Sequence, residues 1–372
     1  MLFKTALPAC LKTGLRAAAA VTLAAGLFIS PLGQGRAVAF EESWDSIEAR
    51  KSPIKCKRKV ESKRIKSVNK NYSIPFKVIL PTDYEVSDKR YGVVLMLCGA
   101  SGARRGAGSE PLYFSVWCKL PRVMDNLAKQ KLGKKDFEYA INDKELKWFN
   151  EKLAGDPFED FIAVDLWHPS SGRDLNYDKF ITEELFAFLD ENYRTIPSKD
   201  FRAIDGACGG GAVALITAFR NPECFAAAGG MQTDLGTFPY ALKFFEENKE
   251  RIRAAGLKFN LNTNKNDVCN SYYFRTKKDE AGNKIKVPDG ELAKLSVMIE
   301  EIGLTAEVNV FSHCAHGYSA YRYPNGHQTM MFYSTLFKEN ARKMKPEELK
   351  ATEVEPQDGR MTKSVMKVRT GQ

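Results

Sequence analysis

The chain has 372 residues, of which 44% are hydrophobic and 27% charged, a balance typical of a globular protein with a sizeable core. Its formal net charge is +10, and the first 39 residues hold four basic residues and no acidic one. The rest of the chain carries 52 basic side chains (56 minus 4) against 46 acidic ones. Such a mild excess, spread along the sequence, argues against a nucleic-acid partner.

The first 39 residues have the pattern of an export signal. Three basic residues precede or flank an uncharged apolar run from Ala17 to Ile29, which is too short for a comfortable membrane span. Ala37-Val38-Ala39 then forms a small-residue cleavage site. We expect this signal peptide to be cleaved, leaving a periplasmic or secreted protein with no stable membrane insertion. An uncleaved membrane anchor is the alternative.

After the signal, we expect an N-terminal extension over residues 40–71, one α/β domain over residues 72–342 and a charged, poorly ordered tail over residues 343–372. Apolar or alternating runs predict strands at Tyr72–Pro81, Val93–Leu97, Phe161–Asp165, Ala203–Asp205, Cys224–Gly230, Leu257–Thr263 and Ala306–Phe311. Helical spacing predicts helices at Trp117–Leu132, Tyr177–Tyr193, a run ending at Phe219, Pro239–Ala255, Glu291–Ile302 and Gln328–Arg342. Charged segments interrupt this pattern at residues 133–156 and 275–290, and we interpret the second as a loop. The alternation predicts a mostly parallel central sheet with helices on both faces.

A glycine cluster lies between the Ala203–Asp205 strand and the helix that follows it. It contains the pattern G-x-C-x-G at Gly206, Cys208 and Gly210. This pattern is similar to the G-x-S-x-G nucleophile elbow of α/β-hydrolases, with a thiol in place of the hydroxyl. The alternative is a glycine-rich turn that carries a buried, inert cysteine. The functional interpretation makes Cys208 a catalytic nucleophile.

A catalytic thiol needs a base, and the base needs an orienting acid. In α/β-hydrolases these residues follow the nucleophile in the order acid, then histidine. Asp267 comes shortly after the predicted strand Leu257–Thr263, and His316 comes five residues after Phe311. We therefore predict the triad Cys208, Asp267 and His316. His327, just before the last helix, is the alternative base.

An oxyanion hole needs two backbone N–H donors. We expect one from Gly209, which follows the nucleophile, and the other from Ala100, in the turn after the strand Val93–Leu97. This assignment depends on position alone, because a backbone donor leaves no trace in the side-chain sequence. No cofactor motif is present, and we expect neither a cofactor nor a metal. A zinc site from His313-x-x-His316, with His327 or Cys314, is a weaker alternative.

The segment around the elbow resembles a known enzyme family. The similar residues are Phe180–Leu185, Asn192–Arg194, the elbow itself, Phe219–Pro222 and Phe225. They resemble the esterase-D-type branch of the α/β-hydrolases, which includes putative esterases and feruloyl esterases. Cys98-Gly99-Ala100 matches the His-Gly-Gly turn of that branch, with Cys98 in place of His. The loop around His316 resembles that of dienelactone hydrolases, which also use a cysteine in G-x-C-x-G. The resemblance covers residues 72 to 340 approximately and implies the α/β-hydrolase fold.

We therefore expect an exported hydrolase that cleaves a carboxylic ester or lactone through a covalent acyl-enzyme. Its substrate would be a small-molecule or carbohydrate-linked ester, and the sequence does not specify an oligomeric state. The alternative is a non-catalytic relative that binds carbohydrate or cell wall.

Seven cysteines remain after signal cleavage, and an odd number in an oxidising compartment indicates one free thiol. If Cys208 is that thiol, the other six can form three disulfides. Cys269 lies two residues after the proposed acid, and Cys314 lies two before the proposed base. If the acid and base touch, the two loops run side by side. We therefore predict a Cys269–Cys314 disulfide, with two independent thiols as the alternative.

Overall fold

The structure is a computed structural model that describes residues 56–169, 171–280 and 283–351. The predicted signal peptide, residues 40–55 of the extension and residues 352–372 of the tail lie outside the described residues. Contacts divide the chain into residues 1–44 and 45–372, and every described residue belongs to the second unit. Within the described ranges, no helix combines the length and the apolar character that a membrane span requires.

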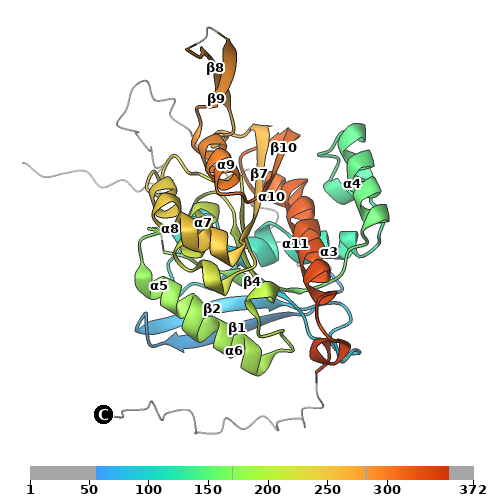
Figure 1. The fold of residues 1–372 in the computed structure, drawn as a ribbon. Coiled ribbons are helices and arrows are strands. Elements are labelled where there is room, and N and C mark those ends of the chain that lie inside the picture. Colours follow the sequence, from blue (N-terminus) through green and yellow to red (C-terminus); the bar gives the residue numbers. More distant parts are fainter. Residues whose placement is uncertain (1–55, 170, 281–282, 352–372) are drawn as a thin grey trace, which may run out of the picture. The chain divides into compact units, whose positions relative to one another are not determined.

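An eight-stranded sheet forms the centre of the described unit (Figure 1). Its strand order is β1-β2-β4-β3-β5-β6-β7-β10. The strands are β1 (Val60–Ser67), β2 (Tyr72–Ile79), β3 (Val93–Leu97), β4 (Ile162–Leu166), β5 (Arg202–Gly206), β6 (Ala227–Met231), β7 (Lys258–Asn266) and β10 (Ala306–Ala315). Pairs β1–β2 and β2–β4 are antiparallel, and the others are parallel. Parallel strands are covered on both faces, which explains the continuous apolar runs in the sequence.

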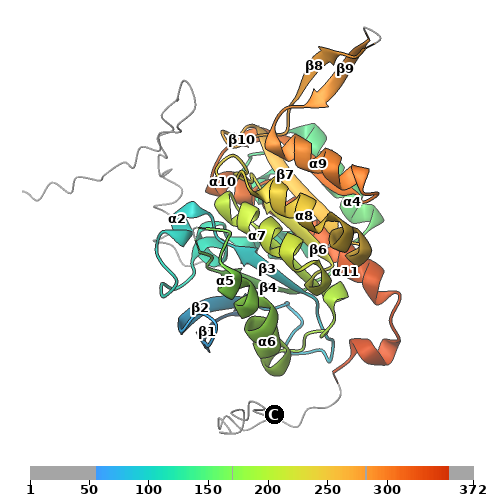
Figure 2. The ribbon, with the colours of Figure 1, turned by 60° about the vertical axis from the view of Figure 1, so that its left-hand side comes forward.

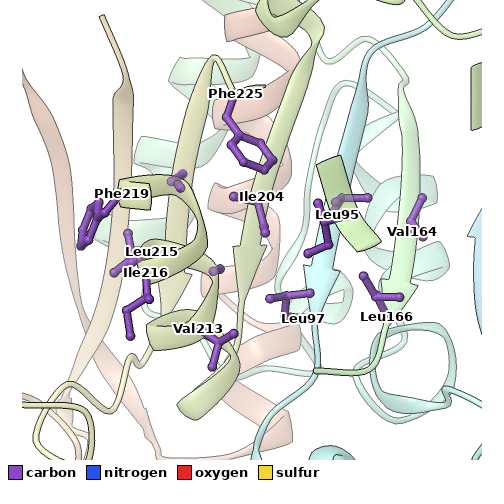
Figure 3. Close-up of a cluster of buried hydrophobic side chains, with 14 of the residues drawn as sticks. Leu95, Leu97, Val164, Leu166, Ile204, Val213, Leu215, Ile216, Phe219 and Phe225 are labelled. Atoms are coloured by element: carbon purple, nitrogen blue, oxygen red, sulfur yellow. The ribbon is translucent and has the colours of Figure 1, made fainter. Parts of the chain in front are cut away.

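Alternate residues of the central strands pack into two different cores. On one face, Leu95 and Leu97 of β3 join Ile204 of β5 and Val213 of the helix that follows the elbow (Figure 3). On the other face, Val94 and Met96 join a second core. Each side chain of β3 thus reaches helices on the face toward which it points, as the period of two requires.

Helices cover both faces of the sheet (Figure 2). The first core includes residues of α5 (Leu175–Lys179), η3 (Phe180–Leu185), α6 (Phe186–Asn192), α7 (Gly209–Arg220), α8 (Ala241–Ala255) and α9 (Glu291–Glu301). The second includes residues of η1 (Tyr113–Trp117), α3 (Leu120–Leu127), η2 (Lys134–Phe137), α4 (Asp143–Gly155), α10 (Tyr318–Arg322) and α11 (Asn325–Ala341). This arrangement confirms the predicted mostly parallel sheet with helices on both faces.

Three segments away from the predicted triad differ from the sequence-based expectations. Strand β1 lies in the predicted extension and pairs along its whole length with β2, so the sheet begins before Tyr72. The predicted loop at residues 275–290 contains a hairpin, β8 (Phe274–Lys278) with β9 (Lys284–Pro288), which projects from the rest of the unit in Figures 1 and 2. In the predicted tail, residues 346–349 form the short helix η6, and Ala351 N–H donates to Asp88 O at 2.7 Å.

Asp205 of β5 is a fully buried carboxyl group directly before the elbow. It accepts hydrogen bonds from Tyr333 Oη at 2.7 Å and from its neighbour Gly206 N–H at 2.7 Å. Burial raises the pKa of Asp205 to about 7, because these hydrogen bonds only partly offset desolvation. The folded protein therefore keeps this proton at pH values where the unfolded chain has lost it.

We expect Asp205 to make the folded state less stable as pH rises. Between about pH 4 and pH 7 the unfolded chain releases the proton more readily, so the free energy of unfolding falls, by on the order of 4 kcal/mol in total. Asp205→Asn should remove this component and so gain stability relative to wild type between pH 5 and pH 8. Urea unfolding of both proteins at the two pH values measures the difference. Equal pH dependence in both would contradict the assignment.

Candidate active site

Cys208 occupies a strained turn at the centre of the sheet, between β5 and α7. Its backbone has φ 54° and ψ −120°, a conformation that a residue with a side chain rarely adopts. A Cβ on Gly206 would lie 2.5 Å from the Gly210 backbone, and one on Gly210 would lie 2.2 Å from Cys98 O. The glycines of the G-x-C-x-G pattern are therefore needed for close backbone packing around the elbow.

The predicted acid and base come together because β7 and β10 are parallel neighbours. Ala315, the last residue of β10, pairs with Asn266, the last residue of β7, so the residues that follow them, His316 and Asp267, also lie side by side. His316 Nδ1–H donates to Asp267 Oδ1 at 2.7 Å. Asp267 Oδ2 accepts from Thr263 Oγ1 at 3.0 Å, which fixes the carboxylate.

An irregularity in β10 makes this register possible. We expected the strand to end at Phe311 and a loop to run to His327, but β10 continues to Ala315 after a shift in register between Phe311 and Ala315. Cys314 lies in this irregular segment with φ 74°. Helix α10 then starts at Tyr318 and occupies part of the predicted loop.

The structure brings a second cysteine to the proposed nucleophile. The Sγ atoms of Cys208 and Cys269 and a ring nitrogen of His316 lie within 4.8 Å of one another. Cys269 Sγ is 4.0 Å from His316 Nε2, and Tyr321 Oη is 3.0 Å from the same nitrogen. Cys269 N–H donates to Asp267 Oδ1 at 2.9 Å, so the backbone turn after the acid directs Cys269 toward Cys208.

Mutual interactions shift the pKa values of these groups in opposite directions. A hydrogen bond from Cys269 and, after it, interactions with His316 lower the pKa of Cys208 to about 5, although burial opposes the change. Burial alone would lower the pKa of His316, but its hydrogen bonds to Asp267 and Cys208 raise it to about 10. The pKa of Cys269 is raised, because it donates to Cys208 and is itself largely buried. The favoured state at neutral pH is a thiolate–imidazolium pair.

Gln232 holds the acid and base loops together. This fully buried residue follows β6 and has φ 49°. Its Nε2 donates to Asn264 Oδ1 at 2.9 Å and to Ala315 O at 3.2 Å, while its Oε1 accepts from Gly317 N–H at 3.1 Å. One side chain thus ties the ends of β7 and β10 to the strand beside them. Its sequence context gave no signal of this role.

The two proposed oxyanion donors each begin a helix. Ala100 is the first residue of the short helix α2 (Ala100–Ala103), and Gly209 is the first of α7. The N–H of a first helical residue has no acceptor within its own helix. The close approach of Gly210 to Cys98 O brings the starts of the two helices together. Gly209 and Ala100 thus remain the predicted oxyanion donors.

Aromatic residues pack beside this turn. Tyr318 Oη lies 2.6 Å from Ser101 Oγ, and the Tyr318 ring meets those of Tyr113 and Trp117 edge-on at 5.2 and 5.5 Å. The ring of Tyr113 lies 6.0 Å from that of Tyr321, which contacts His316. These rings form a continuous aromatic cluster from the turn to the histidine, in which Tyr113, Trp117 and Tyr321 are buried.

The alternative base, His327, lies in the second core. Its ring stacks on Phe137 at 4.3 Å, and Nδ1 is 3.2 Å from Arg322 O. Burial lowers its pKa to about 3, so it is neutral. The zinc site considered from the sequence needed His327 or Cys314 as its third ligand. His327 lies in the core, and Cys314 Sγ donates to Tyr323 O at 3.3 Å.

The predicted Cys269–Cys314 disulfide is wrong, and the two residues are independent thiols. All seven cysteines in the described ranges are unpaired, including Cys269 and Cys314. Their loops do run side by side, but Cys269 faces Cys208 and Cys314 faces the carbonyl of Tyr323. The irregular backbone at Cys314 changes the direction of its side chain, which adjacency in sequence to His316 could not reveal.

Comparisons with known proteins agree with this fold. Residues 67–233 match the family model described as putative esterase. No curated protein matches the sequence. A ferulic acid esterase structure is 16% identical, covers 75% of this chain and 98% of its own, and has a TM-score of 0.53.

Two further structures are more distant. A CE1 ferulic acid esterase from Anaeromyces mucronatus is 12% identical, with 75% and 92% covered and a TM-score of 0.47. A fluorophosphonate-binding serine hydrolase from Staphylococcus aureus is 11% identical, with 74% and 98% covered and a TM-score of 0.46. The matched segment is thus similar to the putative esterase family, and the ferulic acid esterase of the previous paragraph shares the fold.

Proposed function

We propose that this protein hydrolyses a carboxylic ester or lactone through a covalent thioester on Cys208. The observation that carries the proposal is the arrangement of one strained cysteine, one histidine beside it and one carboxylate at 2.7 Å from that histidine. A nucleophile, a base in contact with it and a group that orients the base are the parts of a catalytic triad.

In the first half-reaction, the Cys208 thiolate attacks the substrate carbonyl carbon and forms a C–S bond. The carbonyl oxygen becomes an oxyanion, which the N–H groups of Gly209 and Ala100 would stabilise. As the C–O bond of the ester breaks, the His316 imidazolium gives its Nε2 proton to the departing alkoxide. The products are an alcohol and an acyl-thioester on Cys208.

In the second half-reaction, water replaces the alcohol. Neutral His316 takes a proton from the water as its oxygen attacks the thioester carbonyl. The C–S bond then breaks, and the acid product leaves a Cys208 thiolate beside a His316 imidazolium. Asp267 keeps the imidazole in the required tautomer and orientation in both halves, and Cys269 supplies a hydrogen bond to the thiolate.

The proposed location of the enzyme depends on the sequence alone. The basic and apolar pattern of residues 1–39 supports export, so we propose that the enzyme acts in the periplasm or outside the cell. Small-molecule and carbohydrate-linked esters are the substrate class that we propose.

Turnover of a chromogenic acyl ester tests the proposal. We expect hydrolysis by the reduced protein in the presence of a chelator, and its loss after treatment with iodoacetamide. Peptide mapping of the inactivated protein should show that the alkyl group is on Cys208. A protein that hydrolyses no ester in a panel of acetyl, aromatic acyl and lactone substrates, but binds polysaccharide, would instead support the non-catalytic alternative.

A further inference from the structure

Three potential metal ligands meet at the proposed active site. They are Cys208 Sγ, Cys269 Sγ and a ring nitrogen of His316, all within 4.8 Å of one another. Two sulfurs and one imidazole nitrogen are donors that zinc prefers, and open zinc sites combine three protein ligands with one exchangeable position. We propose that these side chains bind one Zn²⁺ ion. This site differs from the alternative considered from the sequence, since it uses both cysteines and does not need His313, Cys314 or His327.

The separation of the donor atoms is close to that of a tetrahedral site. With Zn–S of about 2.3 Å and Zn–N of about 2.0 Å, two sulfurs lie about 3.8 Å apart and a sulfur and a nitrogen about 3.5 Å apart. Cys269 Sγ and His316 Nε2 are 4.0 Å apart, and no pair in the group exceeds 4.8 Å. Side-chain movements of about 1 Å or less would therefore complete the geometry.

The hydrogen bond between His316 and Asp267 provides independent support. A metal-binding histidine characteristically donates its other ring N–H to a carboxylate or carbonyl, which fixes the tautomer and orients the free nitrogen toward the metal. Here His316 Nδ1–H donates to Asp267 Oδ1 at 2.7 Å, and Nε2 faces Cys269. The same interaction that would orient a catalytic base also orients a zinc ligand.

The backbone already holds the ligands in place. Cys208 is set by the elbow, Cys269 by its N–H bond to Asp267 at 2.9 Å, and His316 by the end of β10. Tyr321 Oη, 3.0 Å from Nε2, would have to turn away when the ion enters. Cys208 is already a thiolate, so as zinc coordinates, Cys269 loses its thiol proton and His316 its Nε2 proton to solvent.

Zinc at this site would block the proposed reaction, and this consequence rests on the proposed function. The ion would occupy both the nucleophile Cys208 and the Nε2 atom of His316 through which protons move. We therefore expect Zn²⁺ to be a reversible inhibitor that a chelator removes. Binding itself does not depend on catalysis, so it is tested separately.

Direct metal binding is measured with the full chain, reduced and then freed of metal and reductant. Titration with Co²⁺ should produce the absorption of a thiolate–cobalt bond, and titration with Zn²⁺ against a chromophoric chelator should give one ion per chain. Cys269→Ser and His316→Ala each remove a ligand. Loss of a residue that only orients a ligand typically weakens metal affinity by about 10- to 100-fold, and we expect a loss of that size for Asp267→Asn. Cys269→Ser and His316→Ala should each weaken zinc affinity by more.

Cys314→Ser is the matched control, because Cys314 is also a half-buried thiol near His316 but faces Tyr323 O. It should bind zinc as the wild type does. A wild type that takes up no stoichiometric zinc, or a Cys269→Ser variant that binds as tightly as wild type, would overturn the site. Zinc binding by a protein that hydrolyses no ester would leave the metal site standing and reject the proposed function. Ester hydrolysis by a protein that binds no zinc would reject the metal site and leave the proposed function standing.

Discussion

Cys208→Ala is expected to lower kcat for ester hydrolysis by about 10⁶-fold, the size of loss that removal of a triad nucleophile causes. The variant lacks the sulfur that forms the covalent intermediate, and the remaining groups can only bind and polarise the substrate. The fold should persist, since alanine keeps the Cβ and Gly206 and Gly210 still allow the close packing of the elbow. Steady-state kinetics and circular dichroism of both proteins check the two statements.

Cys208→Ser is the matched comparison. A serine keeps a nucleophilic atom at the elbow but lacks the lowered pKa of the thiol, so we expect activity well below wild type and above Cys208→Ala. Its activity should also be insensitive to iodoacetamide, although the six other described thiols are still present. Loss of wild-type activity on alkylation would then be due to Cys208. Wild-type turnover by Cys208→Ala would exclude covalent catalysis by this residue.

His316→Ala is expected to lower kcat on the order of 10⁴-fold or more, because one imidazole serves both half-reactions. It protonates the leaving alkoxide and then takes a proton from water. The variant also removes the positive partner of the Cys208 thiolate, so alkylation of Cys208 at neutral pH should slow. Kinetics with a chromogenic ester and the rate of alkylation give independent readouts of these two roles.

His327→Ala is the control for this experiment. That histidine is neutral and stacked on Phe137, so its loss should reduce stability through a cavity more than it reduces kcat. A larger loss of kcat in His327→Ala than in His316→Ala, in proteins that remain folded, would transfer the role of base to His327.

The sequence was sufficient to predict the sheet because its parallel strands are buried on both faces. Runs such as Val93–Leu97 have no polar residue and cannot be mistaken for surface segments. Edge elements carry a weaker signal. Strand β1, Val-Glu-Ser-Lys-Arg-Ile-Lys-Ser, exposes Arg64 and Lys66 and has few apolar residues, and every residue of β8 is exposed. These strands are held by backbone pairing with a neighbouring strand, and they have no apolar face whose pattern would show in the sequence.

Cys208, Asp267 and His316 could also be chosen as candidates from the sequence, since each lies at or shortly after the end of a predicted strand. Parallel pairing of β7 with β10 then brings the acid and base together. The position of Cys269 was not readable, because the direction of its side chain depends on a turn held by Asp267 Oδ1. For the same reason, two cysteines flanking contacting residues did not imply a disulfide.

The most direct test is the mass of the protein during turnover. If the reduced, metal-free enzyme is mixed with an ester whose thioester hydrolyses slowly and is quenched with acid, intact-protein mass spectrometry should show one added acyl group. Fragmentation should locate it on Cys208, and His316→Ala should change how fast it forms and decays. No acyl adduct during measurable hydrolysis, or an adduct on another residue, would contradict covalent catalysis by Cys208.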